Sequence, residues 1–263
     1  MKKIFIMLIS LVSTGLLQAQ ILNIEKYILD RDTTRKMLGN ITGSFVMYNR
    51  SAAENEPVEF LGINFKSSIA IFPGKHRIAS ITDINYLRLN DEPFTNTGYQ
   101  HFRFELFKHL RTNPEAFAQY QYDNFRRLDP RLLAGGGIRH RLLRNNKITL
   151  TLGTGVMYES ERWTHPYAEE IIQANFWKST NYVIFRISLS EWADFNSIQY
   201  YQTAYDPSIN AFRNRFSTDM NLNTTIAKRL LWTVSFTLNY EDRPIIPITK
   251  TIYRFSNGIT FKF

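Results

Sequence analysis

The sequence predicts an all-β protein, an antiparallel transmembrane up-and-down β-barrel of about twelve strands that follows an N-terminal signal peptide. Three observations lead to this fold class. The chain begins with a short basic and apolar export signal, and segments of alternating apolar and polar residues then recur between turn residues. The last segment has one aromatic face and one polar face and ends in Phe263. Together these features favour a cell outer-membrane location over a soluble β-sandwich of similar composition.

Residues 1–19 have the organisation of a secretory signal peptide. Lys2 and Lys3 form a positive start, residues 4–17 form an apolar stretch, and Ala19 provides a small residue at the expected cleavage point. The apolar stretch is shorter than the ~20 residues that a membrane-spanning helix needs, which disfavours an uncleaved anchor. Residues 20–36 are then expected to form a periplasmic segment, either a short helix or an extended tail, and residues 37–263 the barrel.

The composition narrows the range of functions. The chain has no cysteine, which excludes disulfides, thiolate metal sites and a lipid-anchored amino terminus. Its formal charge of +9 falls to 9 − 2 = +7 once Lys2 and Lys3 leave with the signal peptide. Because the basic residues are dispersed and the chain is exported, this charge predicts contact with anionic outer-membrane lipid and no binding of nucleic acid.

Alternation with a period of two defines the strands of the first half, because successive side chains of a strand point to opposite faces. In the second segment, for example, Ile63 and Phe65 face outward while Asn64 and Lys66 face inward. Turns rich in Pro, Gly, Asn and Asp separate the segments. The first seven predicted strands cover residues 37–49, 57–72, 77–90, 99–110, 116–127, 131–143 and 148–159.

The second half contributes five more predicted strands. The segment 211–227 has the clearest pattern, since Phe212 and Phe216 alternate with Arg213 and Arg215. The segment 196–205 carries tyrosine on both faces, so the count falls to ten if that part of the chain is misread. The predicted strands cover residues 181–191, 196–205, 211–227, 231–240 and 253–263.

The connections between strands alternate between the two sides of a membrane, and an even strand number places both termini in the periplasm. The connection 161–180 is predicted to be the longest and to lie outside the cell. It carries Trp163, Tyr167 and Trp177, and Trp192 lies at another strand end. These aromatic residues are predicted to anchor at the membrane interface. The alternative is that the external loop uses its aromatic residues to bind a ligand or a partner. The predicted periplasmic turns are short and cover residues 73–76, 112–114, 144–146, 191–195 and 228–230.

The end of the chain also predicts a partner. Gly258, Phe261 and Phe263 are arranged like the C-terminal signal by which the outer-membrane barrel assembly machinery recognises its substrates. The sequence therefore predicts that this machinery inserts the protein into the outer membrane.

Two stretches carry a likeness to a known family. One runs from Tyr120 to Arg139 and includes a Gly-rich strand, and the other runs from Leu152 to Glu161 and ends in Tyr-Glu-Ser-Glu. They resemble the uncharacterised family labelled salt-induced outer-membrane protein, a domain of unknown function from Gram-negative bacteria. The processing site and the start of the mature chain look like those of Bacteroidota relatives. This resemblance implies a barrel fold and an outer-membrane location, and it implies no activity.

Charged residues on the inward faces are the candidate functional residues. They line the lumen of the predicted barrel, where they either set the selectivity of a small pore or pair with one another and fill a narrow interior. The sequence leaves both hypotheses open. The residues are Asp123, Arg131, Arg139, Arg141, Glu159, Glu161, Arg186, Arg213, Arg215 and Asp219.

Other motifs favour structural roles. Residues 135–137 are three glycines but lack the Lys-Ser/Thr of a phosphate loop, so they are expected to let the strand bend or to let Tyr120 and Tyr122 pack closely. The five histidines show no metal-ligand spacing. The sequence predicts no cofactor, no metal site and no catalytic residue.

The sequence therefore predicts a non-enzymatic outer-membrane barrel that conducts a small solute or ion. The first alternative is a structural or salt-stress envelope protein with a closed, plugged lumen. The second alternative, a hydrolase at the extracellular rim, is disfavoured, although Glu159, Glu161 and His165 are expected at that rim. An outer-membrane lipase is disfavoured because no His-x-Ser pair is present.

Overall fold

The structure is a computed structural model and describes residues 36–51, 57–168, 170–227 and 230–261. These residues form twelve strands in a single sheet, which is the number that the alternation predicts. Residues 196–205, the segment with tyrosine on both faces, lie within a strand. The strands are β1 (Met37–Ser51), β2 (Pro57–Ile71), β3 (Arg77–Leu89), β4 (Glu92–Glu105), β5 (Thr112–Asp123), β6 (Leu128–Arg144), β7 (Ile148–Thr164), β8 (Ile171–Ser188), β9 (Ala193–Asp206), β10 (Ala211–Ala227), β11 (Leu230–Glu241) and β12 (Thr251–Phe261).

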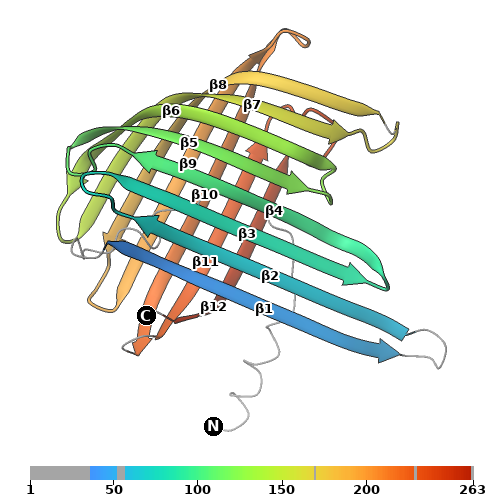
Figure 1. Ribbon diagram of the computed structural model, residues 1–263, viewed down its shortest axis with the longest axis horizontal. Helices are drawn as coiled ribbons and strands as arrows, with labels where there is room; N and C mark the ends of the chain where they lie inside the picture. Colours follow the sequence, from blue (N-terminus) through green and yellow to red (C-terminus); the bar gives the residue numbers. More distant parts are fainter. Residues whose placement is uncertain (1–35, 52–56, 169, 228–229, 262–263) are drawn as a thin grey trace.

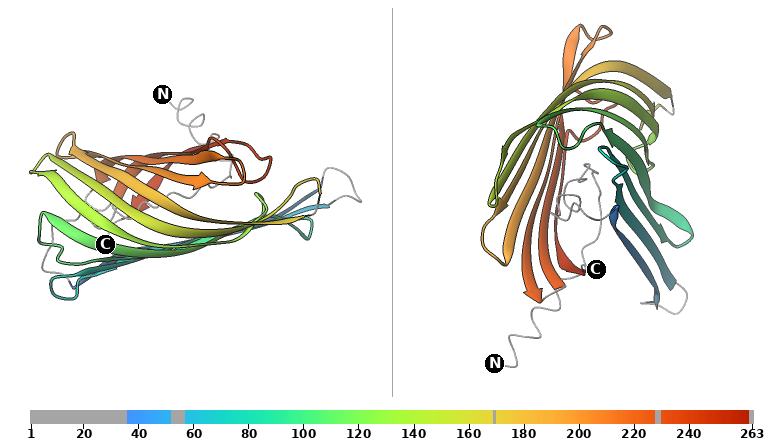
Figure 2. Two further views of the ribbon diagram at one scale, coloured as in Figure 1. Left: turned by 90° about the horizontal axis from the view of Figure 1, so that it is seen from above. Right: turned by 60° about the vertical axis from the view of Figure 1, so that its left-hand side comes forward.

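Each strand pairs antiparallel with the next one in the chain, so the topology is up-and-down throughout (Figure 1). Among the described residues, no hydrogen-bonded ladder joins β1 to β12, and the sheet is open in its hydrogen bonding. The sheet nevertheless bends over, so that β9–β12 face β1–β4 across a concave side (Figure 2). One face of the sheet is therefore enclosed, and the other faces outward.

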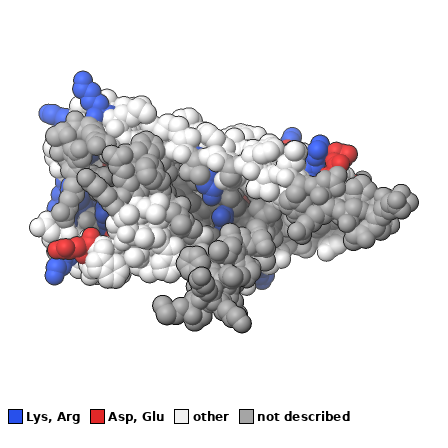
Figure 3. Space-filling view, turned by 90° about the horizontal axis from the view of Figure 1, so that it is seen from below, with Lys and Arg blue, Asp and Glu red and all other residues white. Residues whose placement is uncertain are grey.

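The alternation of burial along the strands follows this geometry. In β3 the side chains of Arg77, Ala79, Ile81 and Asp83 are buried, and those between them are more exposed. The concave side therefore holds charged as well as apolar residues. The convex side carries large exposed apolar residues on nearly every strand, among them Ile63, Phe102, Ile138, Val156, Trp177, Phe212, Trp232 and Tyr253. Figure 3 shows one view of the molecule, in which most of the coloured charged side chains lie toward the two ends.

The hairpin between β3 and β4 differs from the prediction. Asn90 and Asp91 both have positive φ, 47° and 65°, as a two-residue type I′ turn requires. Pairing then resumes at once, and β4 begins at Glu92 rather than at Tyr99 as predicted. The first residues of β4 include Pro93 and lack clear alternation, so the sequence pattern did not reveal this part of the strand.

The predicted long loop 161–180 is wrong, because most of it is strand. β7 continues to Thr164 and β8 begins at Ile171, and the two pair along their whole length. The buried side chains of β8 include Ala174, Phe176 and Lys178, which is a mixed set. A charged residue on the same face as apolar ones obscured the alternation.

Several sequence predictions lie outside the described residues. These are the signal peptide 1–19, the segment 20–35 and the terminal Phe263. Gly258 and Phe261 belong to β12, where their backbones are opposite Thr233 and Leu230 of β11. Within the described part of the chain, no helix has the length and apolar character needed to cross a membrane.

Candidate functional site: an enclosed network of charges around a small cavity

The enclosed face of the sheet has two ends. The loop end carries the β5–β6, β7–β8, β9–β10 and β11–β12 connections, and the turn end carries the β2–β3, β4–β5, β6–β7 and β8–β9 connections. Antiparallel pairing of consecutive strands places the connections in this way. Charged side chains gather on the concave side toward both ends.

Glu159 of β7 is the centre of the network at the loop end. Its side chain is fully buried, at 0% exposure. Arg131 donates to it from Nε at 3.0 Å, Arg215 approaches it from Nη1 at 3.2 Å, and Lys178 forms a further ion pair. These three cations come from β6, β8 and β10. Glu159 therefore links strands that are not all neighbours in the sheet.

Two more carboxylates extend the same network. Glu161 accepts from Arg215 at 2.9 Å and from the indole nitrogen of Trp163 at 3.1 Å. Glu241, the last residue of β11, pairs with Arg215 at 3.2 Å and with Arg126 of the β5–β6 connection at 3.7 Å. Arg126 also lies 5.7 Å from the centre of the Trp163 ring. The loop end is thus crossed by a continuous set of ion pairs.

A second group of charges lies toward the turn end. Glu105 at the end of β4 pairs with Arg77 of β3 and accepts from Arg139 of β6 at 3.2 Å. All three side chains are buried. Two cations therefore share one carboxylate in this part of the interior.

Arg103 of β4 lies between the two groups. It donates to the hydroxyl of Tyr200 at 3.1 Å and lies 3.6 Å from a carboxylate oxygen of Glu115. The other oxygen of Glu115 accepts from Tyr182 at 2.7 Å. The guanidinium group is 5.3 Å from the centre of the Tyr182 ring and 5.9 Å from that of Phe117. These contacts run from β4 and β5 across the interior to β8 and β9.

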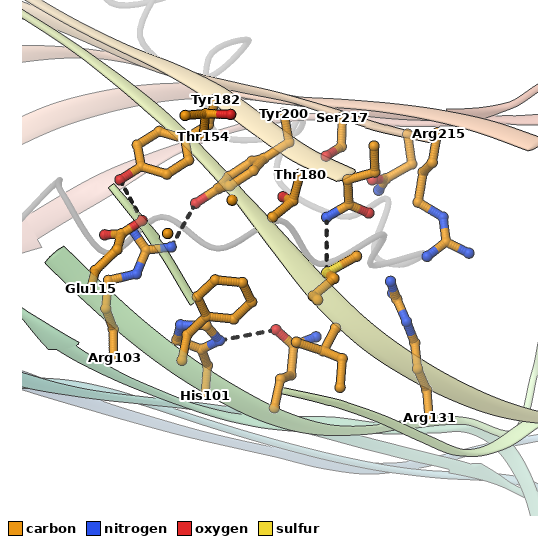
Figure 4. Close-up of a pocket in the computed structure, with 18 residues that line it drawn as sticks. His101, Arg103, Glu115, Arg131, Thr154, Thr180, Tyr182, Tyr200, Arg215 and Ser217 are labelled. Atoms are coloured by element: carbon orange, nitrogen blue, oxygen red, sulfur yellow. Dashed lines mark hydrogen bonds and ion pairs between the residues drawn. The ribbon is translucent and has the colours of Figure 1, made fainter. Parts of the chain in front are cut away.

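A cavity of about 80 Å³ separates Arg103 from the network at the loop end. Figure 4 shows Arg103, Glu115 and His101 along one part of its wall and Arg131 and Arg215 along another. Uncharged side chains complete the lining: Phe117, Gln119, Leu133, Met157, Thr154, Thr180, Tyr182, Tyr200, Gln202, Ser217 and Asn239.

The β11–β12 connection, residues 242–250, folds inward at the loop end. Ile246 is buried against Leu128 and Trp163, and Ile245 packs against apolar side chains of β8 and β9. Arg213 of β10 joins this connection to the end of β9, because it pairs with Asp206 at 2.6 Å and donates to the carbonyl of Pro244 at 3.0 Å. This connection covers part of the interior from the loop end.

Apolar packing occupies the interior near the turn end. Ala70 and Ala79 of β2 and β3 belong to one buried cluster with Ile184 and Ile198 of β8 and β9. Strands from the two halves of the bent sheet therefore touch there through apolar side chains.

The structure brings some of the predicted lumen residues together and separates others. Arg131, Glu159, Glu161 and Arg215 form the network at the loop end, and Arg139 belongs to the group around Glu105. The other five lie outside these two groups. Asp123 accepts from the backbone of Arg126, Arg213 pairs with Asp206, Asp219 accepts from Asn221, Arg141 donates to the carbonyl of Lys108, and Arg186 is half-buried in β8.

Sequence reasoning missed several members of the two groups. Lys178 fell in the predicted loop, so its inward position could not be read. Arg103 and Glu105 were not among the candidate residues, although their alternation with Phe102 and Phe104 indicates an inward position. Nothing in the sequence indicates that Tyr182 and Tyr200 meet Arg103, because the tyrosines belong to strands far along the chain, and the Arg103–Tyr200 contact joins residues 97 positions apart.

Two expectations about aromatic and glycine residues need correction. Trp163 is 1% exposed and lies inside, so it is not an interfacial anchor, whereas Trp177 is 70% exposed. The ring of Tyr122 packs over Gly98 rather than over the three glycines. A Cβ on Gly135 would lie 2.8 Å from Phe117, and one on Gly137 would overlap the Thr154 carbonyl oxygen. The glycines therefore permit close packing of β5, β6 and β7.

The residues considered for hydrolysis have other partners. Glu159 and Glu161 are buried among cations and are not at an exposed rim. His165 accepts a hydrogen bond at Nδ1 from the backbone N–H of Tyr167 at 3.2 Å. Within the described ranges, no three His, Asp or Glu side chains are grouped so that they could hold a metal ion.

Comparison with known proteins places the chain in a family. A search of curated proteins gave no match. The family described as "Protein of unknown function, DUF481" matches residues 62–263, which run from β2 to the last residue and include the strands that enclose the cavity. The chain belongs to the DUF481 family.

Proposed function

We propose that the protein is a non-enzymatic outer-membrane β-barrel whose interior is closed to solute flow. The observation that carries the membrane location is the reversed distribution of side chains, with charges inside and large apolar residues outside. Soluble monomeric proteins rarely expose such extensive apolar surface. In a lipid bilayer the same surface is favourable, and charges facing the lipid would cost about 2–4 kcal/mol each for Arg or Lys near the midplane.

The strand lengths agree with this proposal. They range from 11 residues in β12 to 18 in β8, and a tilted membrane strand needs about 9–11. In lipid, an open row of backbone donors and acceptors is costly. We therefore propose that β1 and β12 meet when the protein is in the membrane, and that the barrel assembly machinery brings them together.

Three features support a closed interior over a conducting pore. The ion-pair network crosses the loop end, the β11–β12 connection folds inward beside it, and the apolar cluster of β2, β3, β8 and β9 fills the turn end. The cavity between them is small. We therefore propose a structural role in the envelope in preference to solute transport, and the suggestion of a role under salt stress rests only on the family resemblance.

Fluorescence quenching by lipid tests the membrane orientation. In a variant that keeps only Trp232, whose side chain is exposed on the convex side of β11, lipids with brominated acyl chains should quench most of the emission. In a variant that keeps only Trp163, which is buried inside, they should quench little. Phenylalanine would replace the other tryptophans in both variants. Equal quenching of the two would contradict the proposed orientation.

Conductance in a planar bilayer tests whether the interior is closed. The refolded protein should insert and stay electrically silent, because the charge network and the apolar cluster block the interior at two levels. Heat-modifiable migration on a gel would show that the inserted protein is folded. Steady channels whose ion selectivity changes in Arg139→Ala or Arg215→Ala would overturn the closed-interior proposal and favour a pore.

A further inference from the structure

Three connections at the turn end carry positive charge only. The β2–β3, β4–β5 and β6–β7 connections, residues 72–76, 106–111 and 145–147, contain lysine and arginine and neither aspartate nor glutamate. Arg144, the last residue of β6, adds one more cation. The β11–β12 connection at the loop end instead mixes both signs. We call the positive surface the basic rim, and its cations are Lys75, Lys108, Arg111, Arg144 and Lys147.

The three connections of the basic rim lie side by side at one end of the sheet (Figure 1). Hydrogen bonds between backbone groups join their neighbourhoods. The N–H of Lys108 donates to the carbonyl of Lys75 at 2.8 Å, and the N–H of Arg141 donates to the carbonyl of Arg111 at 2.8 Å. The cations therefore belong to one continuous surface.

Carboxylates do not balance the charge of the basic rim. Within the ranges that the structure describes, none of its five cations forms an ion pair with another described residue. Glu105, which directly precedes the β4–β5 connection, is buried and already engaged by Arg77 and Arg139. The basic rim therefore attracts anions, in contrast to the paired charges around Glu159.

Arg111 is the cation of the basic rim whose side chain is held in place. Its Nε and Nη2 atoms donate to the carbonyls of Arg141 and Leu142, both at 3.1 Å. These carbonyls belong to a bulge, because the pairing of β6 with β7 shifts between Arg141 and Leu143. Carbonyl groups orient the guanidinium group without neutralising it, and arginine has five N–H donors. Donors therefore remain for a ligand.

Apolar side chains at the same bulge are exposed. Leu142 and Leu143 are 40% and 42% exposed, and Leu110, which precedes Arg111, is 44% exposed. At a membrane surface, apolar side chains contact acyl chains while basic side chains reach the headgroups. A fixed guanidinium group beside exposed leucines is therefore suited to a lipid whose headgroup is negatively charged.

We propose that the basic rim binds an anionic glycerophospholipid, such as phosphatidylglycerol, at Arg111. The headgroup phosphate accepts from the guanidinium group. Arg144 and Lys147 add attraction from the neighbouring connection, and the acyl chains lie against Leu142 and Leu143. This inference rests on the proposed outer-membrane location and deepens it, because it names the lipid class at the turn end.

A tryptophan beside the bulge reports which lipid is bound there. The reporter protein carries Leu143→Trp, and phenylalanine replaces its four natural tryptophans. It is refolded into phosphatidylcholine bilayers that contain a small fraction of brominated phosphatidylglycerol or of brominated phosphatidylcholine. Brominated phosphatidylglycerol should quench at a mole fraction at least roughly 5-fold lower, the factor that one Lys or Arg contributes at an anionic surface.

Neutral variants of the reporter protein separate the basic rim from the net charge. Combining Arg111→Gln, Arg144→Gln and Lys147→Gln should abolish the preference for phosphatidylglycerol. The matched control makes Arg88→Gln, Arg127→Gln and Lys250→Gln at the loop end, which lowers the net charge equally and should keep the preference.

Arg111→Gln also removes the hydrogen bonds to the bulge, so a second variant leaves that arginine in place. Arg144→Gln with Lys147→Gln should weaken the preference on its own, because neither side chain has a hydrogen-bond or ion-pair partner among the described residues. Heat-modifiable migration would show that each variant is folded.

The outcomes distinguish the lipid site from the membrane orientation. Equal quenching by the two brominated lipids, or a preference that survives the triple substitution at the basic rim, would overturn the site and leave the orientation in place. A preference lost equally in the loop-end control would assign it to net charge and also overturn the site. Absence of quenching by either lipid would contradict the orientation and, with it, this site.

Discussion

Replacing Glu159 with glutamine is expected to lower the free energy of unfolding by about 3–5 kcal/mol, the range found when one partner of a buried ion pair is removed. Glutamine has nearly the same shape, so the loss is electrostatic. Three cations, Arg131, Lys178 and Arg215, would remain inside without the carboxylate that they share. Urea-induced unfolding of the protein in lipid vesicles, followed by tryptophan emission, measures the effect.

The matched control is Asp91→Asn, which removes a carboxylate of the same charge from an exposed pair. Asp91 lies 3.2 Å from Arg88, and its side chain is 82% exposed. Exposed pairs contribute about 0–1 kcal/mol, so this variant should unfold close to the unaltered protein. Similar stabilities of the two variants would mean that the charges around Glu159 are solvated rather than enclosed.

Replacing Gly137 with alanine is expected to prevent stable pairing of β6 and β7, with a loss of at least about 3 kcal/mol or a failure to fold. The added Cβ would overlap the Thr154 carbonyl oxygen and would lie 2.9 Å from the Cα of Gly155. Both are backbone atoms of the paired strand, so no side-chain rotation relieves the overlap. The fraction of protein that shows heat-modifiable migration after refolding measures the effect.

Gly43→Ala is the matched control for this prediction. Gly43 also lies within a strand, and no atom lies within 4 Å of a Cβ built on it. It should refold as well as the unaltered protein. A Gly137→Ala protein that refolds equally well would show that β6 and β7 are farther apart than the structure places them.

The period-two pattern made the strands predictable, because each strand has one face toward the interior and one toward the outside. The number of strands and the inward position of Arg131, Glu159 and Arg215 could therefore be read from the sequence. Two strand segments were missed because their side chains do not alternate between apolar and polar. The start of β4, near Glu92, contains a proline, and β8, which begins at Ile171, buries Lys178 on the same face as apolar residues.

The candidate site could be predicted only in part, because alternation gives the face of a residue and not its partner. The alternation of Arg103 with Phe102 and Phe104 indicates its inward position, but it does not indicate its partners. Its contacts with Tyr182 and Tyr200 depend on how far the sheet bends, and pairing of consecutive strands does not determine that bend. The inward fold of Ile246 likewise depends on a connection without periodicity.

The contacts across the interior have a consequence for the order of folding. Pairing of neighbouring strands joins residues close in the sequence, so each hairpin can form on its own. The Arg103–Tyr200 contact instead spans 97 residues, and the Arg215–Glu161 contact spans 54. Contacts between distant parts of a chain form slowly because they close long loops. We therefore expect the contacts between distant strands to form after the hairpins, so that the buried charges lose their water late in assembly.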